Sequence, residues 1–344
     1  MAVVTGLPAG LAIAEGDIAA DLARRQNPLG AGGRMAIEHD TAHILAGVMA
    51  GKTTGAPVAL AIENRNHAAW KGREVAAITT PRPGHADFAA SVKYGYDDAR
   101  LALERASARE TAARVAAGAV CRKFLAEFGI SVEGRVLEIG GVEGEEAIAD
   151  AIAKAKAEGE TLGGIIEIVA RGVPVGLGAS VVAAERLDAR LAGALMGMQA
   201  IKGVEIGDGF MLARRRGSEA QDEIARDAEG GVVRGTNRNG GIEGGVSNGE
   251  AIVARIAMKP IPTVLKGLGT VDFATGEAAR TVYERSDFCP VPRAVVVAEA
   301  IECVVLADAL KEKLGGDSID EMKARFASLA KEPRYDAAAK VFWP

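Results

Sequence analysis

The order of strand-like and helix-like segments is the feature that most constrains this fold. Short β-branched segments come first, and helical patterns with apolar residues three to four positions apart follow. Because the two kinds do not alternate regularly, the order argues against a Rossmann fold or a barrel and favours an α+β architecture. We find no repeat and no Pro-, Ser- or charge-rich linker, so we expect a single domain, residues 1–344.

The individual elements are predicted from these patterns. Strands are expected at residues 2–11, 34–38, 43–53, 58–63, 165–169 and 251–258. Helices are expected at residues 16–26, 108–128, 145–158, 184–199, 294–312 and 318–330.

Charge and cysteine content narrow the range of partners. The 344 residues carry a formal net charge of only −5, which gives no overall attraction to nucleic acid or to an anionic membrane. Any phosphate would therefore be held by local arginines. Cys121, Cys289 and Cys303 are too scattered for a disulfide framework or a metal site, and they suit a reducing cytoplasm. We find neither a signal peptide nor a membrane span, and we predict a cytoplasmic protein without a metal.

A glycine-rich run at residues 30–33 is the feature that suggests a dinucleotide-binding fold. Glycine clusters are most often turns. The run follows an expected helix and precedes an expected strand, whereas a dinucleotide fingerprint lies between a strand and a helix. A nucleotide-dependent dehydrogenase is therefore a disfavoured alternative.

A helix start is predicted where Ser107 and Glu110 have the spacing of a capping box. The free amides at such a start attract phosphate, and Arg105 and Arg109 add positive charge beside it. The alternative is an ordinary cap with solvated arginines, and the motif alone does not decide between the two.

His85 has the most informative surroundings of the four histidines. It lies on a loop constrained by Gly and Pro, with Arg82 three residues before it and Asp87 two residues after it. A histidine near a carboxylate can act as an acid or base near neutral pH, although it can also simply bond the loop backbone. The other histidines lack such neighbours and are expected at the surface or in structural roles: His39, His43 and His67.

Arginines recur in several short motifs. Arginine can bind phosphate and carboxylate through two hydrogen bonds at once, so convergence of these side chains would indicate a small substrate with several negative charges. The alternative is that most of them form surface ion pairs. The candidates are Arg24, Arg25, Arg34, Arg82, Arg105, Arg109 and Arg285.

Ordered motifs along most of the chain resemble those of chorismate synthases. No single motif is decisive, but their number and order make chance similarity negligible. The motifs are RPGHAD at residues 82–87, KYG at 93–95, ERASARET at 104–111, RVAAGA at 114–119, KGVEIGDG at 202–209, NRNGGIEGGVSNG at 237–249, MKPIPT at 258–263 and ERSD at 284–287.

The resemblance implies an activity and a fold. Chorismate synthases convert 5-enolpyruvylshikimate 3-phosphate into chorismate and phosphate, the last common step of the shikimate pathway. The reaction is a 1,4-anti elimination that needs reduced FMN but causes no net redox change. The resemblance further implies a helical layer between antiparallel β-sheets, and a cytosolic homotetramer. Some members reduce FMN with NADPH and others rely on an external reductant such as a flavin reductase, and no motif decides this here.

The resemblance also implies residue roles. His85 would lie near the flavin and hold its protonation state, and Asp287 would relay the proton from flavin N5. The substrate would be bound by Arg25, or its neighbour Arg24, and by Arg34, Arg82 and Arg109. FMN would contact Arg105, Ala106, Ser107, Gln199, Ala200, Gly244, Lys259, Pro260, Ile261, Pro262, Thr263 and Arg285.

Two departures from the family concern the substrate side of the site. The family opens with Gly-Glu-Ser-His-Gly on the strand before the segment that matches residues 5–10, whereas Met1 lies inside that strand. The histidine of that motif is the proposed general acid, and loss of a positioned acid typically slows a reaction about 10²- to 10⁴-fold. Ala31 stands where the family usually has a substrate-site arginine. We therefore expect FMN binding to survive better than turnover, and a non-catalytic FMN- or anion-binding protein is the alternative.

Overall fold

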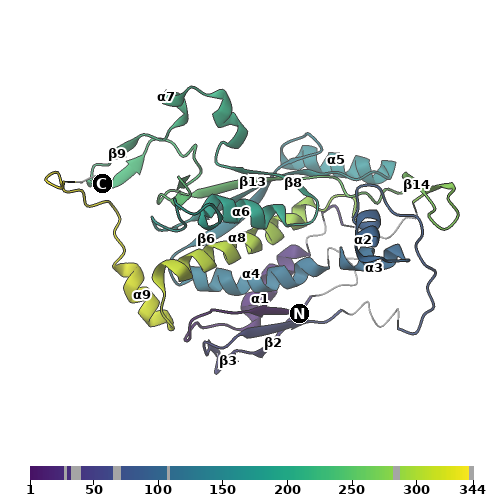
Figure 1. Cartoon of the computed structure of the whole chain (residues 1–344), viewed down its shortest axis with the longest axis horizontal. Coiled ribbons are helices and arrows are strands. Elements are labelled where there is room, and N and C mark those ends of the chain that lie inside the picture. The colour runs from purple at the N-terminus through teal and green to yellow at the C-terminus, as the bar shows by residue number, and fades with distance from the viewer. Residues whose placement is uncertain (27–28, 32–39, 65–70, 107–108, 282–286, 341–344) are drawn as a thin grey trace.

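The computed structural model describes the chain except residues 27–28, 32–39, 65–70, 107–108, 282–286 and 341–344. Figure 1 shows a layer of helices between two antiparallel β-sheets. This arrangement confirms the predicted α+β sandwich.

Two antiparallel sheets form the outer layers. The first has the order β1-β5-β2, with β1 at Ala2–Val4, β5 at Val58–Ile62 and β2 at Ala42–Ala46. The second has the order β6-β7-β13-β8, with β6 at Ser131–Ile139, β7 at Gly164–Arg171, β13 at Ile252–Met258 and β8 at Ile201–Ile206. The remaining strands form two-stranded pairs: β3 Val48–Met49 with β4 Lys52–Thr53, β9 Ile224–Arg226 with β10 Val232–Arg234, β11 Ile242–Glu243 with β12 Val246–Ser247, and β14 Gly269–Val271 with β15 Ala278–Arg280.

The second sheet keeps its register because apolar residues alternate along its central strands. In β13, Ile252, Ala254 and Ile256 are buried, and they lie opposite the buried Ala170, Ile168 and Ile166 of β7. A slip of one residue would turn both rows away from the helices.

Four helices form the central layer. They are α1 Glu15–Arg25, α4 Glu110–Ala126, α6 Leu187–Met196 and α8 Val291–Leu314. Helix α4 packs on β1 and β5 on one side and on α8 on the other, while α8 also contacts β6 and β7. Most of α8 is therefore buried around its circumference, as its all-round apolar sequence requires. None of the helices in the described part of the chain is long and apolar enough to cross a membrane.

The remaining helices lie around this sandwich. They are α2 Asp87–Tyr94, α3 Ala99–Arg105, α5 Glu145–Glu158, α7 Gly217–Ala220, α9 Ile319–Ala327 and the 3₁₀ turns Ala183–Glu185 and Gly209–Arg214. All six predicted helices are present, α5 at the predicted bounds and the other five with shifted ends, whereas α2 and α3 were not predicted.

Two predicted strands are wrong in their extent. The strand expected at 2–11 ends at Val4, because Gly6 and Gly10 adopt positive φ angles of 80° and 92°. The strand expected at 43–53 breaks into β2, β3 and β4, because the chain bends at Gly47, at φ 85°, and turns at Ala50 and Gly51, at φ 49° and 75°. The strand expected at 34–38 lies outside the described residues, and the single domain stays a prediction.

Glu299 of α8 joins three other elements to that helix. Its carboxylate, fully buried, accepts hydrogen bonds from Arg24 Nη2 and Arg122 Nη2, each at 2.7 Å, and from Gly134 N at 2.8 Å. Asp21 then accepts from both arginines, at 2.8 and 2.9 Å. This ionic cluster connects α1, α4, α8 and β6.

Glu302 lies one helical turn after Glu299 and has a different environment. Both of its carboxyl oxygens are buried, and neither has a hydrogen-bond partner among the described residues. Burial, together with the nearby charge of Glu299, raises the pKa of Glu302 to about 8. The side chain is therefore largely protonated in the folded protein at neutral pH.

The first prediction concerns the crossing of α4 and α8. A Cβ at Gly118 would lie 2.3 Å from Ala300 Cβ and 2.5 Å from Ala300 Cα, so Gly118→Ala must push the helices apart. We expect it to lower the free energy of unfolding by about 1–3 kcal/mol in urea denaturation. Gly193→Ala is the control, because Gly193 lies exposed in α6 with no atom near its added Cβ. It should raise stability by about 0.5–1 kcal/mol, and equal effects of the two changes would contradict this packing.

The second prediction concerns Glu302→Gln. In the unfolded chain the carboxyl ionises near its ordinary pKa of 4.5, whereas in the folded chain it keeps its proton up to about 8. The wild-type free energy of unfolding should therefore fall between these pH values relative to that of the variant. Urea denaturation at pH 5, 6, 7 and 8 should show a growing advantage of Glu302→Gln, reaching a few kcal/mol. Glu312 lies on the same helix as Glu302 but is exposed and pairs with Arg190 of α6, so Glu312→Gln should show no such trend. A pH-independent difference for Glu302→Gln would refute the buried neutral acid.

Candidate functional site

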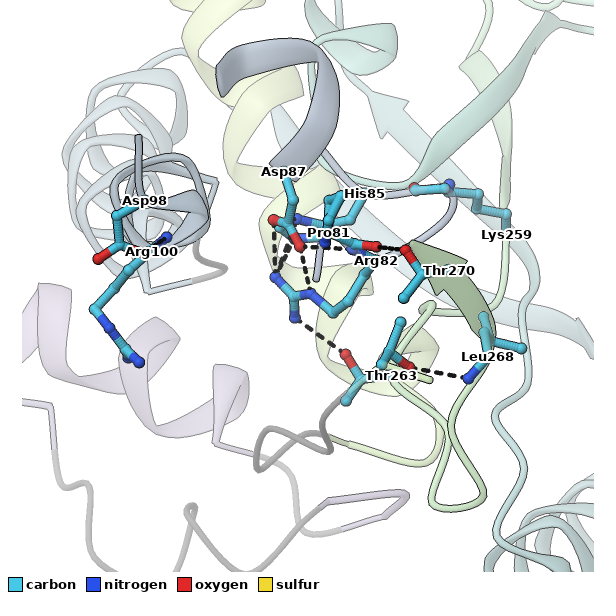
Figure 2. A network of polar contacts seen from close by, with 12 residues as sticks. Pro81, Arg82, His85, Asp87, Asp98, Arg100, Lys259, Thr263, Leu268 and Thr270 are labelled. Atoms are coloured by element: carbon cyan, nitrogen blue, oxygen red, sulfur yellow. Dashed lines mark hydrogen bonds and ion pairs between the residues drawn. The ribbon is translucent and has the colours of Figure 1, made fainter. Parts of the chain in front are cut away.

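Arg82, His85 and Asp87 form one compact polar network where a loop enters α2 (Figure 2). Arg82 donates from Nε to Asp87 Oδ2 at 2.7 Å and from Nη2 to Oδ1 at 3.1 Å. His85 Nδ1 contacts Asp87 Oδ1, and Arg82 Nη2 lies 3.1 Å from the same ring nitrogen. The Asp87 side chain is almost completely buried. The structure therefore brings together two of the predicted site residues, Arg82 and His85, through Asp87.

The charge of Asp87 determines how His85 is oriented. Burial alone would raise the pKa of Asp87, but hydrogen bonds from His85 and Arg82 outweigh it and hold the pKa well below its usual range. An ionised carboxylate can only accept hydrogen bonds, so Nδ1 of His85 must carry the proton that faces it. The network therefore orients the His85 ring, with Nδ1 facing Asp87 and Nε2 as the ring nitrogen that does not bond this carboxylate.

The segment from Lys259 to Thr263 lies against this network. Arg82 Nη1 donates to Thr263 Oγ1 at 3.2 Å, and Lys259 Nζ donates to the carbonyl of Gly84 (Figure 2). On the other side, Thr270 of β14 donates to the carbonyl of Pro81 at 2.6 Å. The loop that carries His85 is therefore held from two segments distant in sequence.

The residues Gln199 and Ala200 form a second corner of the site. Lys259 N donates to Ala200 O at 2.9 Å, and Gln199 Nε2 donates to Glu110 Oε2 at 2.5 Å. Gln199 Oε1 is buried without a hydrogen-bond partner among the described residues. Ala200 has a φ of 66°, a left-handed conformation that costs an L-residue about 1–2 kcal/mol. Such local strain is frequent where a backbone must present a group to a ligand.

The start of α4 lies at the last residue of the predicted capping box. The helix begins at Glu110, and its N-cap residue Arg109 makes no side-chain capping hydrogen bond. The Glu110 carboxylate bonds Arg114 and Gln199, whose hydrogen bonds hold its pKa below the usual value against the opposing effect of burial. Ser107 lies outside the described residues. Arg105 ends α3 and is exposed, and Ala106 forms the C-cap of that helix.

Arg25 and Arg109 meet at Asp40. Arg25 Nη1 donates to one carboxylate oxygen at 3.0 Å, and Arg109 Nη1 donates to the other at 2.5 Å. Arg25 Nε also donates to Thr111 Oγ1 at 3.0 Å, and the Arg25 side chain is nearly buried. The carboxylate of Asp40 therefore holds the two guanidinium groups next to each other. Arg24, the alternative to Arg25, instead faces the Glu299 cluster, whose hydrogen bonds raise its pKa.

A chain of backbone hydrogen bonds links these parts. Gly30, five residues after Arg25, accepts from Phe288 N at 3.1 Å, and Phe288 O accepts from Leu162 N at 2.9 Å. Thr161 Oγ1 donates to Ile261 O at 2.7 Å. Because a Cβ at Gly30 would lie 2.5 Å from Cys289 O, Gly30 serves close packing here. It follows helix α1 with no described strand between them, so the dinucleotide fingerprint lacks its required context.

Asp287 lies beside this chain, next to Phe288. It forms an ion pair with Arg293 in the first turn of α8. Asp287 is therefore held at the N-terminal end of the central helix, near Gly30 through its neighbour Phe288.

Some predicted site residues are not joined to the others. Gly244 lies in the turn between β11 and β12, and Gly245 O accepts from Leu187 N at the start of α6. Gln199 follows the opposite end of that ten-residue helix, about 15 Å away along its axis. Arg34, Ser107 and Arg285 lie outside the described residues, as do His39 and His67. His43 lies exposed on β2.

The sequence patterns did not single out Asp40 or Thr270. Asp40 stands alone between segments without a motif, and Thr270 lies far from His85 along the chain, so only the folded contacts indicate their roles.

Pro260 and Pro262 flank Ile261, and both are partly exposed. Among the described residues, no group of His, Cys, Asp or Glu could hold a metal ion. The three cysteines are buried free thiols.

Comparison with known proteins places this site in a family. The profile of the family described as chorismate synthase matches residues 1–310. A chorismate synthase of Caldanaerobacter subterraneus subsp. tengcongensis is 53% identical over 326 residues, covering 95% of this chain and 93% of that protein. One of Thermoanaerobacter pseudethanolicus is 52% identical with the same coverage.

A solved structure agrees with these sequences. A crystal structure of chorismate synthase is similar to this fold with a TM-score of 0.76 and 40% identity, over 94% of this chain and 91% of that one. The sequence matches and the fold thus span the same residues that build the network around His85. The chain belongs to the chorismate synthase family, a family of lyases.

Proposed function

We propose that this protein converts 5-enolpyruvylshikimate 3-phosphate into chorismate and inorganic phosphate, with reduced FMN as cofactor. The reaction removes one proton and one phosphate from the substrate and forms one C=C bond, so it has no net redox change. The observation that carries the proposal is the buried Asp87 carboxylate, which holds Arg82 and His85 in one network in a chain of this family.

The arginines supply charge for a substrate with phosphate and carboxylate groups. Arg25 and Arg109 converge on Asp40, which holds their two guanidinium groups side by side in the region proposed to bind the substrate. Planar guanidinium groups bind phosphate and carboxylate in two-point contacts, and each charge-assisted hydrogen bond contributes about 1.5–3 kcal/mol. Arg82, which donates to Thr263, would add a further positive charge for the substrate.

The residues around Gln199 fit a flavin. The buried Gln199 Oε1 is an acceptor without a donor among the described residues, and a flavin ring offers N–H donors. Ala200 is held in a left-handed conformation beside it, and Lys259 provides a cation for the flavin phosphate. Gln199, Ala200 and the segment 259–263 would hold FMN. Reduced FMN, when bound, supplies electron density for the departure of phosphate and a nitrogen that can accept the proton.

His85 and Asp287 are the groups that can hold or move that proton. Asp87 keeps the Nδ1 proton of His85 in place, so exchange occurs at Nε2. Asp287 is kept close to α8 by Arg293, and we propose that its carboxylate relays the proton away from the site. Asp87 itself acts by positioning His85 and Arg82.

Other parts of the proposal follow from the family alone. They are the homotetramer, the cytoplasmic location, the choice between NADPH and a separate flavin reductase, and the roles of Arg34, Ser107, Gly244 and Arg285. We propose no contact with nucleic acid or membrane, given the weak net charge.

A third prediction tests the positioning role of Asp87. Asp87→Asn replaces the carboxylate that fixes His85 with an amide, which has one accepting oxygen instead of two, so kcat should fall about 10²- to 10⁴-fold, the usual range for a displaced acid or base. FMN affinity should change much less, because the residues proposed to hold FMN, Gln199, Ala200 and Lys259, are unchanged. Glu167→Gln is the matched control. Glu167 is also buried and bonds two arginines, Arg135 and Arg255, but it lies in the second sheet.

Glu167→Gln should lower stability while leaving kcat within about twofold. If Asp87→Asn keeps full kcat, or if both variants lose activity in proportion to stability, Asp87 has no positioning role.

A fourth prediction tests the activity. Under anaerobic conditions with chemically reduced FMN, 5-enolpyruvylshikimate 3-phosphate should yield chorismate and phosphate in equal amounts. FMN binding is measured in parallel by fluorescence. Binding of FMN with no product would contradict the proposed reaction and favour a non-catalytic FMN-binding protein. Product formation without FMN would contradict the cofactor.

A further inference from the structure

The hairpin of β14 and β15 contacts the loop of residues 79–87, although the two lie far apart in the sequence. Its strands pair antiparallel, from Gly269 to Val271 and from Ala278 to Arg280. At the base of the hairpin, Thr281 and Leu268 exchange two hydrogen bonds, each of 2.9 Å. The hairpin is therefore closed by its own hydrogen bonds before it reaches the loop.

Two hydrogen bonds join the hairpin to alternate carbonyl groups of this loop. Phe273 N donates to Thr79 O at 3.0 Å, and Thr270 Oγ1 donates to Pro81 O at 2.6 Å. The rings of Phe273 and Phe88, whose centroids are 5.5 Å apart, connect the same hairpin to α2. The hairpin thus holds both the loop and the helix into which the loop leads.

The carbonyl of Pro81 belongs to the same peptide group as the N–H of Arg82. That N–H donates to Asp87 Oδ2 at 3.1 Å. The peptide is planar and trans, so its carbonyl and its N–H point in opposite directions. Thr270 and Asp87 therefore bond the two ends of one rigid group, and Figure 2 shows the bond from Thr270. Rotation of this group would weaken both bonds, and hydrogen bonds in such a chain strengthen one another.

Asp87 extends this constraint to His85. Its Oδ2 accepts from both the backbone N–H and the Nε of Arg82, and its Oδ1 contacts His85 Nδ1. The carboxylate is almost completely buried, so protein groups rather than bulk water determine its rotation. The hydroxyl of Thr270 thus acts on His85 through one peptide and one carboxylate.

We propose that Thr270 is a positioning residue of the His85 network, because its hydroxyl fixes the peptide that directs the N–H of Arg82 at Asp87. This role rests on the function proposed for His85. It extends the site to the hairpin of residues 268–281, which contains none of the residues predicted to bind FMN or substrate.

The first test observes His85 directly and needs no turnover. The chain has four histidines, so protein labelled with ¹³C at histidine Cε1 gives one NMR signal from each, and His85→Gln identifies the signal of His85. Thr270→Val removes the hydroxyl at nearly the same side-chain size. It should move the His85 signal in the same direction as Asp87→Asn does, whereas Thr270→Ser, which keeps a hydroxyl, should restore the wild-type position.

Thr275→Val is the matched control for this measurement. Thr275 lies exposed in the turn of the same hairpin, where its hydroxyl accepts from Glu277 N at 3.3 Å. Its replacement should leave the His85 signal unchanged. A wild-type signal in Thr270→Val, or an equal shift in Thr275→Val, would overturn the proposal whatever the turnover assay shows.

The second test measures turnover. Thr270→Val should lower kcat about three- to tenfold, the effect expected from one lost hydrogen bond, and change FMN affinity by less than about twofold. In the Asp87→Asn background the same change should lower kcat by less than about twofold, because the contact through which it acts is already altered. A wild-type kcat for Thr270→Val, or full additivity of the two changes, would overturn the proposal. Absence of turnover in the wild type would contradict the proposed lyase instead, and the His85 signal would then decide the role of Thr270.

Discussion

The buried carboxylate of Glu299 is the contact on which the arrangement of this molecule depends. It lies in the middle of α8 and accepts hydrogen bonds from α1, from α4 and from the backbone of β6. Removal of one partner from a buried ion pair typically costs about 3–5 kcal/mol, because the other charge stays buried. Arg24 and Arg122 share a second acceptor, Asp21, so the cluster has alternating charges and fixes the helices in both distance and rotation.

The same cluster determines which side chains at the ends of α1 and α4 face the site. With Arg24 directed at Glu299, its neighbour Arg25 must point about 100° around α1, which directs it to Asp40 and Thr111. In α4, Arg122 anchors one part of the helix while Glu110 and Arg109 at its start reach Gln199 and Asp40. The site is therefore built from helix ends whose rotation is set deep inside the layer.

The sequence predicted the parts of the structure that depend on local pattern, and missed those that depend on pairing across the chain. Amphipathic helices such as α5 were found at their observed bounds, because one face of each must be apolar. The strand expected at 43–53 is wrong in its extent, because β-branched residues favour a strand there whereas Gly47 bends the chain. The directions of Arg24 and Arg25 could not be predicted from sequence, since they depend on the position of Glu299, 275 residues away from Arg24. The resemblance named Gln199 and Ala200, but the strain at Ala200 and the free acceptor of Gln199 appear only after folding.

An unsatisfied polar group does not by itself mark a functional site, and this chain shows the difference. Gln199 Oε1 and Glu302 both lack partners among the described residues. Glu302 can remove its charge by keeping a proton, so it can remain in an apolar layer. The amide of Gln199 has no such option, and its other end is held by Glu110 next to a strained Ala200. Two unfavourable features, the unpartnered Gln199 Oε1 and the strained Ala200, thus lie at one point among the described residues, and a bound ligand with a hydrogen-bond donor would satisfy the first of them.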